Sequence, residues 1–103
     1  MFKVAMQPRF GHFCGVGSRA VELLSSEVYP HLDGGGVVEF DFDAVRNMNS
    51  SFGNALFASL VRRYGDGIVT SVKIINARPN VRAEILSSLS LGSSGAPDQQ
   101  AEG

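Results

Sequence analysis

Cysteine is almost absent from these 103 residues, and tryptophan is missing altogether. The single Cys14 excludes an internal disulfide framework, which is typical of proteins from a reducing compartment. Gln7 and Pro8 follow the initial MFKVAM, so the chain begins with no apolar run of signal-peptide length. No apolar stretch approaches the length of a membrane span. We therefore expect a cytoplasmic protein with no membrane segment.

Charge is also scarce, because only 18% of the residues are charged and the formal net charge is −1. A chain without a basic field lacks the electrostatic attraction that nucleic-acid binding usually requires, so we expect no nucleic-acid partner. The hydrophobic content is 44%, which is sufficient for one core at this length. We expect a single domain over residues 1–91 and a disordered tail over 92–103, where apolar periodicity ends.

Strand-like and helix-like apolar periods alternate along the chain, which predicts a small α/β domain with a mostly parallel sheet and about three helices. The order is β(β)αβαβα, with 37–42 as the central strand. Ser18 is expected to cap the first helix and Pro30 to end it, and Ser50 or Ser51 is expected to cap the second. The predicted elements are strands at 2–6, around 12–14, at 37–42 and at 68–75, and helices at 18–29, at about 51–64 and from Pro79 onward.

The glycine-rich loop 11–19 contains a weak match to a dinucleotide fingerprint, G-x-G-x-x-A over residues 15–20, with Asp41 about twenty residues further on. No lysine follows a glycine in this loop, so the phosphate-binding P-loop motif is absent. Gly17, Ser18 and Arg19 at a helix start are candidates to hold an anion, although a capping serine followed by a solvent-facing arginine explains the same residues.

Few residues suggest catalysis or metal binding. Cys14 with His12 or His31 is a conceivable nucleophile and base, but the three lack zinc-site spacing and Cys14 is more typical of a small buried residue. Asp41 and Asp43 follow the central strand, where carboxylates can serve acid–base chemistry or bind Mg²⁺, and where turn residues are commoner. We therefore expect no enzyme activity, no cofactor and no metal.

Residues 39–64, EFDFDAVRNMNSSFGNALFASLVRRY, resemble the signature of the STAS domains, named for sulfate transporters and anti-sigma factor antagonists. They are still more similar to the divergent STAS-like family of unknown function, and Gly17-Ser18-Arg19-Ala20 resembles a helix start of that family. In the antagonists a partner kinase phosphorylates a serine at the matching helix start. The resemblance therefore implies Ser51 as the phosphorylation site, with Ser50 as its neighbour, and a kinase-like ATPase or anti-sigma-type protein as the partner.

The match departs from the antagonists at the helix start, where their Asp-Ser-Ser-Gly-like sequence is replaced by Asn49-Ser50-Ser51-Phe52. A free helix N-terminus would stabilise a phosphate on Ser51. The alternative is that Ser51 serves only as an N-cap.

Three hypotheses follow for function. The first is a non-catalytic regulatory module whose partner-binding face contains Asp43, Arg46, Asn49 and Phe52, with Arg46 and Phe52 as exposed anchors. The second is a small-ligand or nucleotide-binding domain that uses loop 11–19 and Asp41. The third is a homo-oligomer formed through the sheet edge at 2–6.

Overall fold

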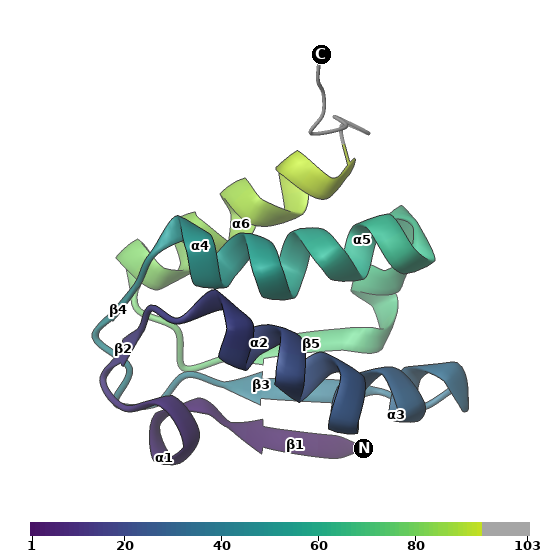
Figure 1. Ribbon diagram of the computed structural model, residues 1–103, viewed down its shortest axis with the longest axis horizontal. Coiled ribbons are helices and arrows are strands. Elements are labelled where there is room, and N and C mark those ends of the chain that lie inside the picture. Colours follow the sequence, from purple (N-terminus) through teal and green to yellow (C-terminus); the bar gives the residue numbers. More distant parts are fainter. Residues whose placement is uncertain (94–103) are drawn as a thin grey trace.

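The computed structural model describes residues 1–93 as one α/β layer structure, with helices packed over one face of a parallel sheet (Figure 1). The predicted fold class is confirmed, as are the central strand and the two short N-terminal strands. The strands are β1 (Phe2–Ala5), β2 (Phe13–Cys14), β3 (Val38–Asp41), β4 (Asn47–Met48) and β5 (Val72–Ile75). The helical segments are α1 (Met6–Phe10), α2 (Gly17–Leu23), η1 (Leu24–Val28), α3 (Tyr29–Asp33), α4 (Ser50–Gly53), η2 (Asn54–Ala58), α5 (Ser59–Tyr64), η3 (Asp66–Ser71) and α6 (Pro79–Ser93).

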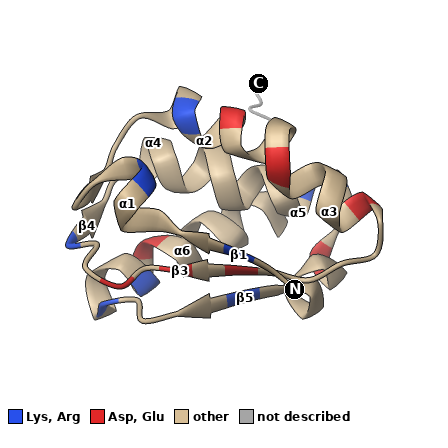
Figure 2. Cartoon of the chain, turned by 90° about the horizontal axis from the view of Figure 1, so that it is seen from below, with Lys and Arg blue, Asp and Glu red and all other residues tan. Residues whose placement is uncertain are grey.

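The main sheet has the order β1-β3-β5, and both of its pairings are parallel. Side chains alternate across it, so Val4, Val38 and Phe40 enter the core. There the Phe40 ring packs edge to face on Phe57, with the ring centroids 5.4 Å apart. The other face carries Lys3, Glu39 and Lys73 side by side in register. Figure 2 shows these charges as a basic, an acidic and a basic segment on adjacent strands.

The helical segments within residues 1–93 outnumber the predicted three, because α1 and η3 are too short to show a helical period in sequence. The predicted strand 68–75 is correct only from Val72. Its first part forms the 3₁₀ helix η3, which brings Ile68 into the core. A tertiary contact therefore overrides the strand preference of β-branched residues.

Pro30 does not end the first helix, which continues without a break from Gly17 to Asp33. The π-helical segment η1 precedes it, and in η1 the Tyr29 N–H donates to the Leu24 carbonyl. Pro30 then stands in the first turn of α3, where its missing N–H is tolerated. The third long helix also exceeds its prediction, since Gly92 and Ser93 belong to α6. The remainder of the predicted tail, 94–103, lies outside the described residues.

Candidate functional site

The loops that follow the carboxyl ends of the strands meet at one end of the molecule, on the left in Figure 1. The loop after β1 contains β2, and the loop after β3 contains β4. These two short strands pair in parallel, with Phe13 opposite Asn47 and Cys14 opposite Met48. Open α/β sheets commonly bind their ligands and partners at this end. We call this region, residues 11–19 and 42–51, the carboxyl-end surface.

Asn49 ties the two loops of this surface together. Its Oδ1 accepts a hydrogen bond of 2.9 Å from the Phe52 N–H and so caps α4, and its Nδ2 donates to the Gly15 carbonyl at 3.1 Å. The expectation that Ser50 or Ser51 is the cap is therefore wrong, because the loop ends one residue earlier. Asn49 was also predicted to contact a partner, and its half-buried side chain is committed to these internal bonds.

Ser50 and Ser51 occupy the first two positions of α4 and are both exposed. Within residues 1–93, neither hydroxyl makes a hydrogen bond. Ser51 lies close against α2, because a Cβ on Gly17 would come within 3.0 Å of its Oγ. Glycine at position 17 therefore lets the starts of α2 and α4 approach one another. The result is an exposed serine at a helix start whose hydroxyl has no capping role.

The predicted anion loop is only partly available. Ser18 is not the cap of α2, because Val16 occupies that position and makes no side-chain capping bond. The Arg19 N–H donates to the Val16 carbonyl at 3.0 Å. Its guanidinium donates to the Arg9 carbonyl at 2.8 Å and lies 5.1 Å from the Phe10 ring centroid. Ligand binding by Gly17, Ser18 and Arg19 stays a prediction.

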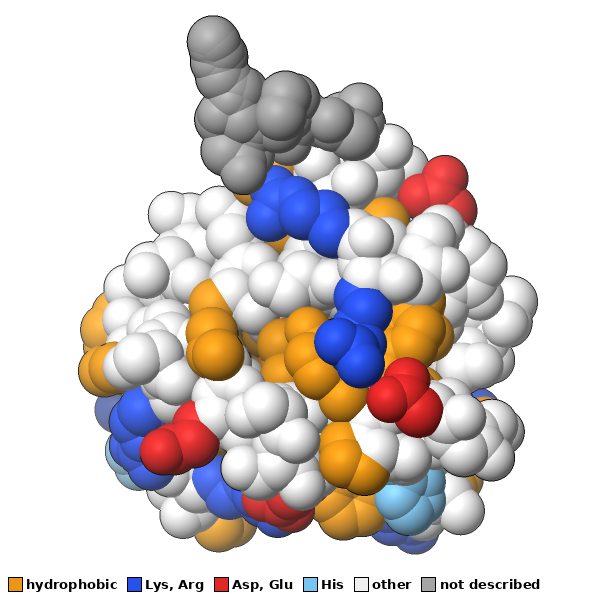
Figure 3. Space-filling view, turned by 45° about the vertical axis from the view of Figure 1, so that its right-hand side comes forward, with side chains coloured by type: hydrophobic (Ala, Val, Ile, Leu, Met, Phe, Trp, Pro, Cys, Tyr) orange, Lys and Arg blue, Asp and Glu red, His pale blue; other side chains and the backbone are white. Residues whose placement is uncertain are grey.

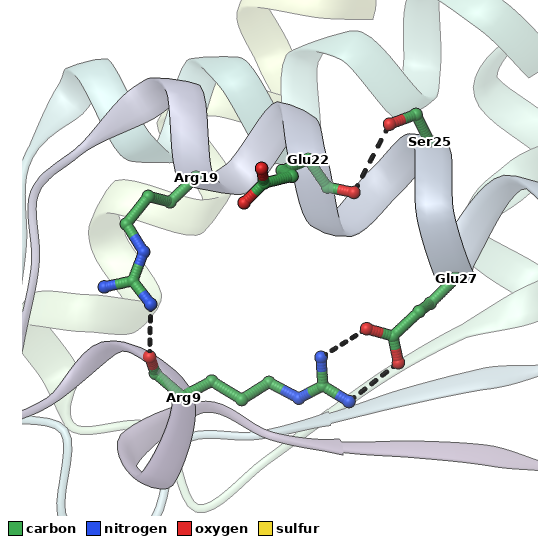
Figure 4. A network of polar contacts seen from close by, with 5 residues as sticks. All are labelled: Arg9, Arg19, Glu22, Ser25 and Glu27. Atoms are coloured by element: carbon green, nitrogen blue, oxygen red, sulfur yellow. Dashed lines mark hydrogen bonds and ion pairs between the residues drawn. The ribbon is translucent and has the colours of Figure 1, made fainter.

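An open polar groove of about 440 Å³ lies beyond Arg19, between α1 and α2. In Figure 4, Arg9 extends across it and meets Glu27 through two parallel contacts of 2.5 and 2.7 Å, while Glu22 comes from the same helix as Arg19. This pairing lowers the pKa of the Glu27 carboxyl and raises that of the Arg9 guanidinium. Arg9 is therefore neutralised locally, and Arg19 is the groove's other cation.

Phe52 is not an exposed anchor, and that prediction is wrong. Its side chain is 0% exposed and packs edge to face on Phe10, with the ring centroids 5.0 Å apart. The third position of α4 points toward the core, so a large apolar side chain is buried there. The exposed apolar residues of this surface are instead Phe13 at 54% and Val16 at 55%. The strand alternation around the buried Cys14 was the available signal for Phe13.

Asp43 and Arg46 are both exposed on the loop before β4, where they were predicted to face a partner. The backbone of Arg46 is held firmly, since its N–H donates to the His12 carbonyl at 2.7 Å and its carbonyl accepts from Asn80 Nδ2 at 2.9 Å. In the described part of the chain, its guanidinium has no ion-pair or hydrogen-bond partner. A rigid backbone thus presents an unpaired cation.

Asp41 at the end of β3 is already engaged. Its Oδ1 accepts hydrogen bonds of 2.9 Å from Asn76 Nδ2 and from the Asp43 N–H. These bonds, that of Asn76 first, hold the pKa of the Asp41 carboxyl below its ordinary value, so it is a poor proton acceptor near neutral pH. Asn76 and the nearby Ala44 both adopt positive φ, of 59° and 67°, where their loops turn sharply. Asp41 therefore holds the start of the loop after β3 and the start of the loop after β5.

The cysteine and histidines considered for catalysis are not brought together. Cys14 is buried, and burial raises the pKa of its thiol to about 11, which leaves it protonated and unreactive at neutral pH. His12 Nδ1 lies 2.9 Å from the Ala44 carbonyl, and His31 stacks on Phe2 at the start of β1. Among residues 1–93, no three His, Cys, Asp or Glu side chains gather as metal ligands.

No helix within residues 1–93 has the length and hydropathy needed to cross a bilayer.

Comparison with known proteins identifies the family. The family model of the STAS-like domain of unknown function (DUF4325) matches residues 22–82, which is more than half of the chain. The match includes all of 39–64, where the resemblance was found in sequence, whereas Gly17 to Ala20 lie before it. No curated protein and no solved structure matches the chain. From the strand–loop–serine–helix arrangement at 39–64 and this match, the chain belongs to the STAS-like domain family of unknown function.

Proposed function

We propose that the chain is a non-catalytic regulatory module that binds a partner protein through the carboxyl-end surface, and that phosphorylation of Ser51 releases this partner. The observation that carries the proposal is the state of Ser51. Ser51 is exposed in the first turn of a helix, yet Asn49 provides the cap. A serine that is accessible and free of a capping role is suited to modification.

The electrostatics of the site support a phosphate at this position. The first turn of α4 offers N–H groups and the positive end of a helix that continues through η2 and α5 to Tyr64. A phosphate adds a charge of about −2 at neutral pH, which such a helix start stabilises while a partner of like charge is repelled. The modification would therefore leave the fold intact and alter the surface.

The choice of partner class comes from the family resemblance. Anti-sigma factor antagonists are phosphorylated by a kinase-like ATPase partner, and a protein of that kind is our proposed partner here. The engaged state of Asp41 and the buried, protonated thiol of Cys14 support a module without catalysis. In this proposal, phosphorylation of Ser51 changes only the affinity of the carboxyl-end surface for the partner protein.

The test is affinity purification of the tagged full chain from its native cell, in four forms: wild type, Ser51→Ala, Ser51→Asp and Ser87→Asp. Ser87 is an exposed serine in the middle of α6 and serves as the matched control. We expect one partner to be retained by wild type, Ser51→Ala and Ser87→Asp and lost by Ser51→Asp, and a fraction of wild type to carry phosphate on Ser51. Equal recovery with all four forms would refute the switch.

A further inference from the structure

Strand β2 and the loop that follows it expose two apolar side chains on a backbone that is held in place. Phe13 and Val16 are each more than half exposed, while Cys14 between them is fully buried. The Cys14 carbonyl accepts from the Asn49 N–H at 3.1 Å, and the Gly15 carbonyl accepts from Asn49 Nδ2. The backbone that carries the two apolar side chains is therefore held in place before any partner arrives, which lowers the entropy lost on binding.

The Phe13 ring is itself folded across Gly15. A Cβ at position 15 would lie 2.4 Å from Cε2 of the ring, so only glycine allows this position of the aromatic side chain. Beside the ring is a small hollow of about 20 Å³, which has room for a single methyl-sized group. Its lining residues are Phe10, Phe13, Gly15, Val16, Arg19 and Phe52.

The charge around this hollow is positive. Arg19 is the one charged residue that lines it among those described. One hydrogen bond to the Arg9 carbonyl leaves further N–H donors of its guanidinium for a ligand. Arg46, on the loop joined to β2 by the β2–β4 pairing, adds a second cation, whose guanidinium has no ion-pair or hydrogen-bond partner within residues 1–93. The acidic residues on these segments are Asp43, on the same loop as Arg46, and Glu22, which lines the groove between α1 and α2.

From this combination we propose that the hollow between Phe13 and Arg19 docks a protein segment in which an apolar side chain is flanked by carboxylates. The apolar side chain packs on the exposed Phe13 and Val16 with its terminal methyl group at the hollow, and the carboxylates pair with Arg19 and Arg46. Aromatic and arginine side chains commonly dominate the energy of such contacts. This inference rests on the proposed function, because it specifies the chemistry of the partner of that same surface.

The proposal also gives the switch a physical cause. Ser51 lies against Gly17, two residues from Arg19 in sequence and next to the loop that forms the hollow. A phosphate there would oppose an acidic segment directly and would compete for the same arginines. A basic partner, in contrast, would bind more tightly after phosphorylation. The sign of the charge on the partner therefore decides the direction of the switch.

Three labelled peptides test this directly: one with a central Leu-Phe pair flanked by Asp and Glu, one with Lys in place of each acidic residue, and one with Ala-Ala in place of Leu-Phe. Binding to the full chain is measured by fluorescence polarisation at two salt concentrations. We expect saturable binding of the acidic peptide that weakens with salt, and at least about tenfold weaker binding of the other two.

Variants locate the binding on the chain. Phe13→Ala and Arg19→Ala should each weaken binding of the acidic peptide by about tenfold. Val69→Ala and Arg62→Ala are the matched controls, since Val69 is 53% exposed and both residues lie outside the carboxyl-end surface. Circular dichroism confirms that each variant is folded. Absence of saturable binding, preference for the lysine peptide, or equal effects of Phe13→Ala and Val69→Ala would overturn the proposal.

Ser51→Asp separates this inference from the proposed function. Peptide binding that maps to Phe13 and Arg19 but is unchanged in Ser51→Asp would support the docking site and refute the switch. Loss of the native partner with Ser51→Asp but no binding of the acidic peptide would support the switch and refute the docking chemistry.

Discussion

The apolar and charged side chains at the two ends of the sheet differ in whether they contact one another. At the amino end, the Tyr29 and Tyr64 rings lie 6.0 Å apart, and the Arg63 guanidinium covers Tyr29 at 4.0 Å. Arg63 also pairs with Asp33, which accepts a hydrogen bond of 2.7 Å from the Tyr64 hydroxyl. Figure 3 shows hydrophobic side chains gathered around a basic one on this side of the molecule.

At the carboxyl end, the comparable groups are left unpaired. Phe13 and Val16 are exposed, and Arg46 has no ionic partner within residues 1–93. Hydrogen bonds at this end instead hold the backbone of the loops, as Asn49 does. The cluster of Tyr29, Tyr64, Arg63 and Asp33 therefore completes its own contacts, whereas the carboxyl-end loops hold Phe13, Val16 and Arg46 without such partners on a fixed backbone. This difference is the structural argument for a binding surface at the carboxyl end.

The largest expected effect distinguishes the two phenylalanines of that end. Phe52→Ala removes a side chain that is fully buried against Phe10, and we expect a loss of about 3–5 kcal/mol in the free energy of unfolding. Phe13→Ala removes a ring that is 54% exposed and should cost much less. Urea unfolding of both variants measures the difference. Equal losses would contradict the assignment of Phe13 to the surface.

A smaller effect tests which residue holds the carboxyl-end loops. Asn49→Ala removes the cap of α4 and the bond to Gly15, and we expect a loss of about 1–2 kcal/mol. Ser51→Ala should change stability by less than about 0.5 kcal/mol, because its hydroxyl makes no internal bond in the described residues. If thermal unfolding ranks the two variants the other way, Ser51 is a capping residue.

The amino end offers its own matched pair of tyrosines. Tyr64→Phe removes the hydrogen bond to Asp33, and a loss of about 1 kcal/mol is expected, whereas Tyr29→Phe should be nearly neutral. Burial, and then the bond to Asp33, raise the pKa of Tyr64, so its contribution is present below pH 10.0 and declines as the pH rises above that value. Unfolding measured against pH should show a weaker alkaline decline in Tyr64→Phe than in wild type.

An effect of similar size to that of Tyr64→Phe is expected at Asp41, which joins two loop starts of the carboxyl end. Its pKa is lowered in the fold, so its contribution is present above pH 3.8 and is lost as the pH falls through the lower folded value. Asp41→Ala should cost about 0.5–1.5 kcal/mol at neutral pH, and the difference from wild type should shrink in acid. A difference that is constant from neutral pH to below pH 3 would contradict the role of the ionised carboxylate.

Much of the fold was predictable because long periodic segments determine it. The central strand at Val38–Asp41, the helix from Pro79 and the parallel arrangement follow from local pattern. The helix boundaries at Pro30 and Ser18 were wrong, since a π-helical turn and an uncapped start depend on packing that sequence periodicity does not contain.

The candidate site was predictable in place but not in detail. Ser51, Arg46 and Asp43 lie exposed at the expected end, but the roles of Phe52 and Phe13 were not distinguished. Which phenylalanine faces outward depends on the phase of α4 and on a two-residue strand, β2, that pairs with β4. These non-local contacts determine the direction of the Phe13 and Phe52 side chains. The apolar residues of the loop sequence alone do not indicate that direction.

Hydrogen exchange of the chain, alone and bound to the partner recovered by affinity purification, tests the central claim most directly. It compares both ends of the sheet in one measurement. The account predicts that the partner protects backbone amides in 11–19 and 43–51 and leaves those in 29–36 and 62–71 unchanged. Protection of the amino-end segments without protection of the carboxyl-end segments would contradict the account.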